Sequence, residues 1–279
     1  MTILAFSTLV GTASLAAGFL GALTGLGGGV VIVPVLTLAF GVDIRYAVGA
    51  SLVSVIATSS GAAAAYVKEG YTNLRVGMLL EIATTLGALA GASLAAVVPA
   101  NAIAVTFGTV LLYSAYISRR PHVEHTGDPL PPDPLAVRLR LDSTFPTPEG
   151  PQAYHVRRVP GGFGLMGVAG VLSGLLGIGS GAVKVLAMDH VMKLPFKVST
   201  TTSNFMIGVT AAASAGVYLS RGYVDPGLAM PVMLGVLAGS FLGAHVLVAA
   251  KSRWLRLVFA SVIVVLAVEM IYNGVVGRF

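Results

Sequence analysis

Two glycine-rich stretches interrupt the apolar regions of the chain: Gly25-Leu26-Gly27-Gly28-Gly29 and, 152 positions later, Gly177-Ile178-Gly179-Ser180-Gly181. Because each glycine disfavours helix by about 1 kcal/mol, three or four of them together predict a break in a helix. At membrane depth such a break is tolerated only where it is buried in protein or lines a cavity. The two stretches therefore predict a pair of broken helices at equivalent points of the chain.

The composition around these breaks is that of an integral membrane protein. Hydrophobic residues make up 56% of the 279 positions and charged residues only 10%, with a mean hydropathy of +0.88. Soluble domains have about 25% charged residues, so too little charge is present to cover a water-exposed surface. The chain has no cysteine, which excludes disulfides and cysteine-ligated zinc. The net charge of +6 lies in loops that orient membrane segments, so nucleic acid is not an expected partner.

The apolar runs predict an all-α membrane fold of about 8–10 membrane segments, because barrel strands would alternate apolar and polar residues. The first run has no charged start, so we interpret it as a retained membrane segment rather than a cleaved signal peptide. The runs are Met1–Leu23, Val30–Phe40, Ala47–Val67, Leu74–Val98, Ala102–Ile117, Phe163–Leu176, Ala182–Met192, Val198–Leu219, Leu228–Ala250 and Trp254–Tyr272.

A segment of different composition separates two apolar halves. Residues 119–160 hold nine of the fourteen prolines and five of the eleven acidic residues. They predict an exposed, largely irregular hydrophilic linker with a short ordered piece at Val137–Leu141. We therefore divide the chain into a membrane repeat over residues 1–118, this linker, and a second membrane repeat over residues 161–279. His122, Glu124 and His125 are interpreted as part of a solvated loop, and no metal or cofactor is expected.

The two halves are related by a constant shift of 152 positions that needs no gap. Beyond the glycine breaks, the register pairs Ser51 with Ser203 and Thr58 with Thr210. Duplicated halves are the usual construction of secondary transporters, which place the substrate site at the repeat interface.

Loop charge indicates how the halves are oriented. With the Arg-rich linker placed inside, most loop Lys and Arg residues fall inside and only Arg45, Arg221 and Arg278 fall outside, as the positive-inside rule requires. The equivalent loop glycines Gly70 and Gly222 then lie on opposite faces. The sequence therefore predicts two inverted-topology repeats with Gly-broken, re-entrant helices, and both termini outside.

The breaks also predict an anion site. The helices that begin at Val30 and Ala182 have free N–H groups, which carry partial positive charge. Two such helix N-termini facing each other would hold an anion without any cation. The alternative is that the glycines only allow close packing of helices.

The residues at the breaks resemble a known family. Leu23-Thr24-Gly25-Leu26-Gly27-Gly28-Gly29 with Pro34 resembles the first-repeat signature of the TauE/SafE sulfite exporter family, and Ala47–Leu52 is similar to its second signature. Residues 174–181 and Thr200–Asn204 look like degenerate second-repeat copies, in which Ser180 replaces a glycine. The resemblance covers both apolar halves. It implies a permease for small sulfur-containing anions, such as sulfite, sulfoacetate or other organosulfonates, in the bacterial inner (cytoplasmic) membrane.

Polar groups near the breaks complete the predicted substrate site. Lys184 lies in an apolar run, where a lysine costs about 2.5–3.5 kcal/mol, so we expect it to be a counter-charge for the anion. A structural pair with Asp189 and snorkelling to the surface are the alternatives. Hydroxyl and amide groups suit sulfonate oxygens, although they also serve as helix caps and interhelical contacts. The predicted substrate-binding residues are Thr24, Gly25, Gly27, Gly28, Gly29, Ser51, Gly177, Gly179, Ser180, Gly181, Lys184, Thr202, Ser203 and Asn204.

Two further ionisable residues are candidates for proton coupling. Glu81 is a candidate proton carrier, or else a partner of Arg75 or Lys68. His245 titrates near neutrality, and its alternative role is packing. The expected coupling ion is therefore H⁺.

These features predict a secondary transporter that works by alternating access, with a small anionic substrate and membrane lipid as its partners. An anion channel, or a permease for a different small organic anion, remains an alternative, and a homo-oligomer is compatible with the sequence. We do not expect an enzyme. The apolar runs contain no metal-ligand spacing, no G-x-S-x-G nucleophile motif and no P-loop Lys-Ser/Thr.

Overall fold

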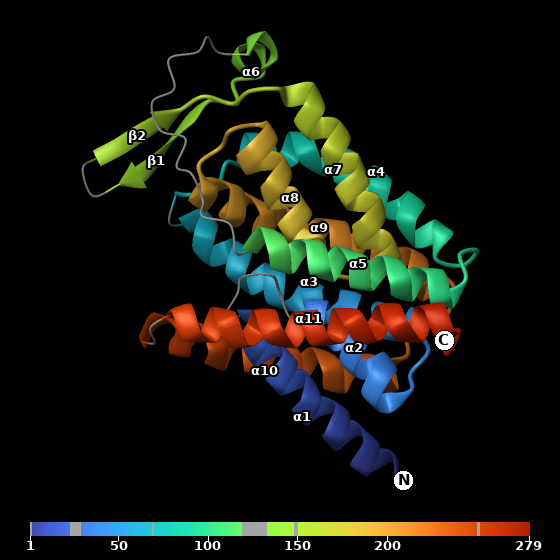
Figure 1. The fold of residues 1–279 in the computed structure, drawn as a ribbon. Coiled ribbons are helices and arrows are strands. Elements are labelled where there is room, and N and C mark those ends of the chain that lie inside the picture. Colours follow the sequence, from blue (N-terminus) through green and yellow to red (C-terminus); the bar gives the residue numbers. More distant parts are fainter. Residues whose placement is uncertain (1, 23–28, 69, 119–132, 148–149, 250–251) are drawn as a thin grey trace.

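The computed structural model describes residues 2–22, 29–68, 70–118, 133–147, 150–249 and 252–279. Within these ranges, three helices are long and apolar enough to cross a membrane: Leu74–Leu94, Val159–Leu176 and Pro226–Gly243. Five shorter apolar helices accompany them. The fold is therefore that of a helical, multi-pass membrane protein, with one small sheet added to it (Figure 1).

Each apolar half forms a similar succession of helices, and the central segment forms short elements of its own (Figure 1). The first half contains α1 (Ile3–Ala22), α2 (Gly29–Pro34), the π-helix η1 (Val35–Ala39), α3 (Ile44–Lys68), α4 (Leu74–Leu94) and α5 (Ala100–Ser118). The central segment contains α6 (Pro134–Arg138), β1 (Ser143–Thr147) and β2 (Gly150–Tyr154). The second half contains α7 (Val159–Leu176), α8 (Gly181–Leu186), the π-helix η2 (Ala187–Val191), α9 (Phe196–Ser220), α10 (Pro226–Ala249) and α11 (Ser252–Val276).

The shift of 152 positions also relates the helix boundaries. It converts α2, η1 and α3 into α8, η2 and α9 at both ends, and it relates the first residues of α4 and α5 to those of α10 and α11. The helix pairs obey the same shift. Helix α1 packs on α10, and the equivalent pair is α7 packed on α4. The other two pairs are α3 with α9 and α5 with α11. Each of these four pairs joins a helix of one half to a helix of the other. The two halves therefore share one interleaved core.

Glycines bring the backbones of these pairs into contact. A Cβ at Gly91 of α4 would collide with the Val171 carbonyl oxygen of α7, and one at Gly174 of α7 would collide with the Ala88 carbonyl oxygen of α4. Gly239 of α10 is placed in the same way against α1. Small residues of this kind allow close helix approach in membranes. Close packing, which the sequence left open for the glycine breaks, is thus the role of these three helical glycines. A Cβ at Gly177 or Gly179 of the second break would also collide with neighbouring side chains.

The outer faces of the paired helices are apolar. Met78, Ile82 and Leu86 of α4 are exposed, as are Met230 and Leu234 of α10. Met78 and Ile82 occupy positions equivalent to Met230 and Leu234. A soluble protein would cover such rows with polar side chains, whereas lipid tails solvate them.

The described part of the central segment contains regular structure that the predicted irregular linker did not include. Residues 133–147 and 150–158 include the short helix α6, which overlaps the expected ordered piece, and an antiparallel hairpin that pairs Ser143 with Tyr154. Asp133 caps α6 by accepting a hydrogen bond from the Leu135 N–H. The sequence signal failed here because prolines, which are usual in irregular segments, occupy the first turn of α6 and an isolated two-stranded ribbon.

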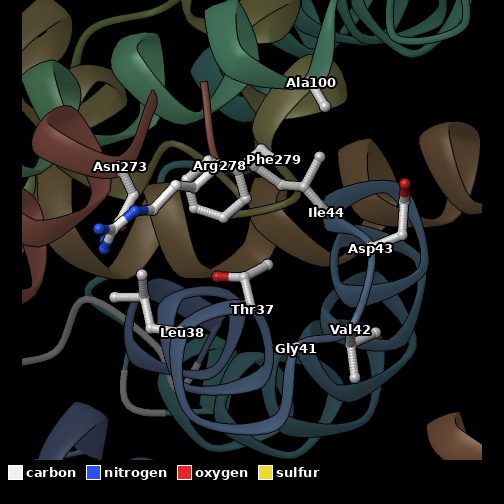
Figure 2. A pocket seen from close by; sticks show the side chains of 10 residues that line it. All are labelled: Thr37, Leu38, Gly41, Val42, Asp43, Ile44, Ala100, Asn273, Arg278 and Phe279. Atoms are coloured by element: carbon white, nitrogen blue, oxygen red, sulfur yellow. The ribbon is translucent and has the colours of Figure 1, made fainter. Parts of the chain in front are cut away.

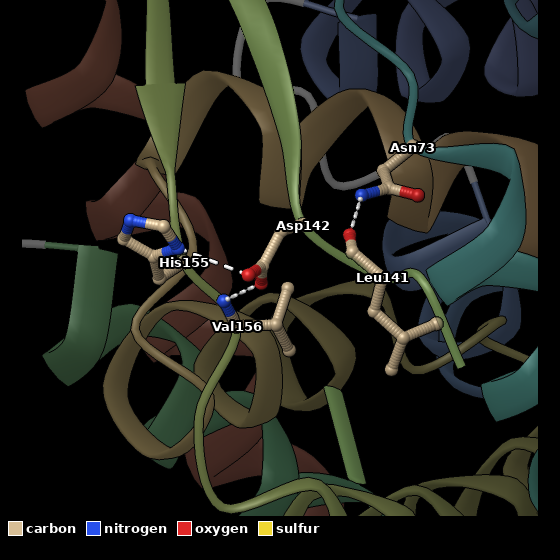
Figure 3. A network of polar contacts seen from close by, with 5 residues as sticks. All are labelled: Asn73, Leu141, Asp142, His155 and Val156. Atoms are coloured by element: carbon tan, nitrogen blue, oxygen red, sulfur yellow. Dashed lines mark hydrogen bonds and ion pairs between the residues drawn. The ribbon is translucent and has the colours of Figure 1, made fainter. Parts of the chain in front are cut away.

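A hydrogen-bonded network fixes this central segment to the helices (Figure 3). Asn73, the N-cap of α4, donates through Nδ2 to the Leu141 carbonyl and to the Tyr154 hydroxyl, both over 2.8 Å. Asp142 is 2.9 Å from His155 Nδ1 and accepts from the Val156 N–H over 2.8 Å. Burial raises the pKa of the Tyr154 hydroxyl above its ordinary value of 10. The hairpin is therefore anchored at the end of the helical body where α4 begins.

Candidate functional site

The second glycine break is present as the sequence predicts. Helix α7 ends at Leu176, and Gly177 and Gly179 follow with φ of +68° and +70°. Both residues have a left-handed backbone conformation. This explains why glycine occupies both positions, because residues with a side chain are strained in that conformation. Ser180 also has a positive φ of 44°, and its hydroxyl donates to the Ala169 carbonyl over 2.7 Å. The residue that replaces a glycine is therefore held by a bond to α7.

The first glycine break lies mostly outside the described residues. Thr24, Gly25, Gly27 and Gly28 belong to that part, so their predicted roles stay predictions. Gly29 is described and begins α2. The segment from Gly29 to Ala39 and its equivalent from Gly181 to Val191 each rise about 16 Å at 1.5 Å per residue, roughly half of a bilayer core.

Ser51 of α3 brings the two break segments together. Its Oγ donates to the Gly177 carbonyl oxygen over 2.8 Å and lies 3.4 Å from the Gly29 carbonyl oxygen. Ser203 of α9, at the equivalent position, lies 3.4 Å from the Gly181 carbonyl oxygen. Both serines are buried. The start of α2, the second break and the middle of α3 therefore meet at one buried point.

A charged centre lies directly beyond the second break. Lys184 of α8 is fully buried, and its Nζ donates to Thr210 Oγ1 of α9 over 2.6 Å. Thr210 Oγ1 donates in turn to Glu81 Oε1 of α4 over 2.7 Å, and Thr85 Oγ1 donates to the same oxygen over 3.1 Å. The hydroxyl of Thr210 thus joins the ammonium group of Lys184 to the carboxylate of Glu81. The lysine is thereby compensated within the protein, as a buried charge requires.

This centre corrects the pairings considered from the sequence. Lys184 is compensated by Glu81 rather than by Asp189, which pairs with His190 at 3.4 Å. Arg75 donates to the Arg140 carbonyl instead of pairing with Glu81. The side chains of Lys68 and His245 lie outside the described residues, so the role of His245 in coupling is untested.

Sequence reasoning did not include Thr85 and Thr210 in the site. One available signal was the spacing of Thr85, four residues after Glu81 and hence on the same helix face. The other was the hydroxyl of Thr210, two helical turns beyond Ser203. Both spacings are common in apolar helices. They therefore identify Thr85 and Thr210 as site residues only once the contacts between the helices are known.

The polar run at the start of α9 mostly satisfies backbone groups. Thr200 and Thr201 donate to the Phe196 and Lys197 carbonyls of their own helix. Thr202 accepts a hydrogen bond from the Asn73 N–H over 3.0 Å. Asn204 is half-buried. The run lies inside α9 and does not cap it, because the helix begins at Phe196 with Pro195 before it.

Two cavities lie near the break segments, but neither reaches Lys184. One of about 10 Å³ touches Ser180 and Gly181 and has room for at most one water molecule. A larger one of about 410 Å³ opens at the end of η1, where Thr37 and Leu38 face Arg278 and Phe279 (Figure 2). Its lining residues are Thr37, Leu38, Gly41, Val42, Asp43, Ile44, Ala100, Asn273, Arg278 and Phe279.

The charged loop residues separate to two ends of the helical body. At one end, Arg45 donates to the Ala95 and Val98 carbonyls, and Arg221 donates to the Ala92 and Ser93 carbonyls, so both lie where α4 finishes. At the other end, Lys197 lies over the ring of Tyr71 near the start of α4. The end that carries Lys197 also carries the hairpin.

Comparison with known proteins gives a consistent result. Residues 10–270 match the family described as Sulfite exporter TauE/SafE. The chain is similar to the probable membrane transporter protein YunE of Bacillus subtilis (strain 168), at 27% identity over 94% of this chain and 96% of the relative. It is also similar to the probable membrane transporter protein YjnA of the same organism, at 29% identity over 91% and 95% of the two chains. A probable membrane transporter protein of Xylella fastidiosa is 24% identical over 98% of each chain. No solved structure matches.

Proposed function

Because the chain belongs to the sulfite exporter TauE/SafE family, whose members are membrane transporters, we propose that it is a secondary transporter for a small sulfur-containing anion. The anion is sulfite, sulfoacetate or another organosulfonate, and the protein works in the bacterial inner membrane by alternating access. The substrate is bound between the two broken helices. Lys184 and the hydroxyl and amide groups of Ser51, Ser203 and Asn204 are its proposed ligands.

The observation that carries this proposal is the meeting of Gly29, Ser51 and Gly177 beside a buried lysine. Membrane transporters place substrate at discontinuous helices near the repeat interface. Ser51 belongs to the first half, Gly177 and Lys184 to the second, so the point lies at the interface between the halves. A buried cation next to irregular backbone has the right chemistry for an anion.

The arrangement of helices supports inverted repeats and re-entrant segments. The shift of 152 positions exchanges the pair α1–α10 with the pair α7–α4 and maps α3–α9 and α5–α11 onto themselves, as a pseudo-twofold axis would. Arg45 and its equivalent Lys197 lie at opposite ends of the helical body. With the hairpin end placed in the cytoplasm, the two halves span the membrane in opposite directions, and rocking of one against the other would expose the site alternately.

Transport by proteoliposomes containing the purified chain tests the proposal. We expect saturable uptake of ³⁵S-sulfite or labelled sulfoacetate that is accelerated by unlabelled substrate on the opposite side. Counterflow of this kind requires a carrier, because an open channel shows no such acceleration. Uptake without acceleration would replace the carrier by a channel, and uptake of carboxylates but of no sulfur anion would overturn the substrate class. Empty liposomes provide the control.

A further inference from the structure

A buried chain of polar groups joins three helices beside the proposed anion site. Lys184 Nζ donates to Thr210 Oγ1 over 2.6 Å, and Thr210 Oγ1 donates to Glu81 Oε1 over 2.7 Å. Lys184 is 0% exposed and Glu81 is 9% exposed. The charge of Lys184 is thus already neutralised by a carboxylate through a single hydroxyl.

This pairing restricts how Lys184 can bind an anion. An anionic group that bound Lys184 while Glu81 stayed ionised would leave an extra negative charge in a buried centre, which is strongly unfavourable. If Glu81 takes up a proton, the centre stays neutral. Before binding, the ammonium group of Lys184 is balanced by the carboxylate of Glu81. After binding, the same ammonium group is balanced by the bound anionic group, and Glu81 is an uncharged carboxylic acid.

The carboxylate of Glu81 has an oxygen available for this proton. Glu81 Oε1 accepts from Thr210 and Thr85, whereas Oε2 is buried and has no hydrogen-bond partner among the described residues. Buried carboxylate oxygens are usually hydrogen-bonded, so an orphaned one calls for an explanation, and a proton that it takes up on binding would be one. A proton can add to Oε2 without breaking either existing hydrogen bond.

The charges around Glu81 single out Lys184 as its partner. Helix α7 has no titratable side chain in its described range. The titratable side chains on α4 itself and on α8, η2 and α9 are Arg75, Lys184, Asp189, His190, Lys197 and Tyr218. Among these, Lys184 is the group that a hydrogen-bonded bridge through Thr210 joins to Glu81.

We propose that Glu81 and Lys184 form one shared unit, in which a proton taken up by Glu81 releases Lys184 to hold the transported anion. This inference rests on the proposed function and adds that each anion bound at Lys184 is accompanied by one proton. An O–H bond forms on Glu81, the ammonium group keeps its protons, and no other covalent bond changes. Thr210 is a positioning residue, whose hydroxyl holds the two charges together until the anion arrives.

Isothermal titration calorimetry with sulfoacetate tests this in the purified full chain. Titrations at pH 7 in buffers of different ionisation enthalpy give the number of protons taken up per ligand. Both acidic groups of sulfoacetate stay ionised at this pH, so the protons report on the protein. We expect about one proton for the wild type and none for Glu81→Gln, which keeps the shape of the side chain but does not titrate.

A matched control comes from the other half of the chain. Thr58 is the equivalent of Thr210, but its hydroxyl donates to the Ser54 carbonyl of its own helix over 3.0 Å. Thr58→Val should therefore keep the wild-type proton number. Thr210→Val removes the hydroxyl that favours the ionised form of Glu81, and should lower the proton number at pH 7.

The pH dependence of affinity gives a second measure that needs no variant. Because binding takes up a proton, the Kd for sulfoacetate in the wild type should rise about tenfold per pH unit wherever free Glu81 is ionised. The Kd of Glu81→Gln should stay constant over the same range.

The outcomes separate this inference from the proposed function. A wild-type proton number near zero, or one that Glu81→Gln leaves unchanged, overturns the shared unit and leaves the sulfur-anion transporter in place. Absence of both sulfoacetate and sulfite binding overturns the proposed substrate class, and the shared unit with it. One proton in the wild type that is lost in Glu81→Gln supports both.

Discussion

The surroundings of the two breaks share their geometry but not their charge. Around the second break, Lys184, Thr210 and Glu81 form a hydrogen-bonded chain across three helices. The equivalent positions, 152 residues away, are Ile32 in α2, Thr58 in α3 and Met233 in α10. Only the threonine is common to both. Thr210 Oγ1 contacts Glu81 as well as the Met206 carbonyl of its own helix, whereas Thr58 Oγ1 contacts the Ser54 and Val55 carbonyls of its own helix.

This difference shows that a repeated scaffold carries different side chains at equivalent positions. Ser51 and Ser203 lie against Gly29 and Gly181 at the same distance of 3.4 Å, so the scaffold of the two breaks is repeated. The hydrogen-bonded chain from Lys184 to Glu81 is present beside the second break, and the equivalent positions beside the first break carry no charged residue. Under the proposed function, a duplicated chain would give two anion sites, whereas this asymmetry predicts one.

The largest expected effect is on stability, from Lys184→Met. Removing the ammonium group leaves Glu81 as a buried uncompensated carboxylate, so we expect a loss of about 3–5 kcal/mol in the free energy of unfolding. Ile32→Met, at the equivalent position, exchanges similar apolar volumes and should cost less than about 1.5 kcal/mol. Chemical unfolding in detergent measures both.

A double variant separates lost charge balance from lost packing. Lys184→Met combined with Glu81→Gln removes both charges, so most of the lost stability should return. A double variant as unstable as Lys184→Met alone would show that packing, and not charge balance, dominates at this centre.

Next in size is an effect that should be equal in the two halves. A Cβ at Gly87 would collide with the Gly167 carbonyl oxygen of α7, and one at the equivalent Gly239 would collide with the Leu15 carbonyl oxygen of α1. Gly87→Ala and Gly239→Ala should each lower the free energy of unfolding by about 1–3 kcal/mol through overpacking. Gly216→Ala meets nothing within 4 Å and should be neutral or stabilising. Clearly unequal losses of stability in Gly87→Ala and Gly239→Ala would contradict the equivalence of the α4–α7 and α1–α10 pairs.

A smaller loss of stability is expected where the central segment contacts the helices, and it should be confined to one half of the molecule. Asn73→Ala removes the cap of α4 and the bonds to Leu141 and Tyr154, so we expect a loss of about 1–2 kcal/mol. Backbone amides of residues 141–156 should exchange hydrogen faster, while those of α1 and α10 should not. Unchanged exchange in the hairpin would mean that Asn73 is not what anchors it.

The smallest expected effect compares the two serines. Ser51→Ala removes a 2.8 Å hydrogen bond to the Gly177 carbonyl and should cost about 1 kcal/mol. Ser203 makes only the longer 3.4 Å contact, so Ser203→Ala should cost less. Thermal unfolding of both variants measures the difference, and a larger loss for Ser203→Ala would contradict the geometry.

The helices and their register were predictable from the sequence because the apolar runs and glycine breaks are local signals. The predicted run Val198–Leu219 is observed as Phe196–Ser220, and the predicted run Val30–Phe40 as Gly29–Ala39. The approach of Gly29 and Gly177 to the same Ser51 hydroxyl was not predicted, because the repeat pairs Gly29 with Gly181 and contains no information about contacts between the halves. The hairpin was not predicted either, because its strands are short and contain proline.

The partner of Lys184 was not predictable from the sequence. Lys184 and Glu81 are far apart in the chain, and they meet only because α4, α8 and α9 converge. Spacing within one helix favoured Asp189 for Lys184 and Arg75 for Glu81, and both of these groups are engaged elsewhere. Local patterns rank neighbours along a helix, but they contain no information about contacts between helices.

The central claim is that the anion binds at Lys184, and ligand-induced thermal stabilisation tests it most directly. Sulfite or sulfoacetate at about 100 times Kd should stabilise the wild type and Ile32→Met by roughly 2.7 kcal/mol. The Lys184→Met/Glu81→Gln double variant should remain folded and show no such stabilisation. Full stabilisation of the double variant, or none of the wild type by any sulfur anion, would contradict the claim.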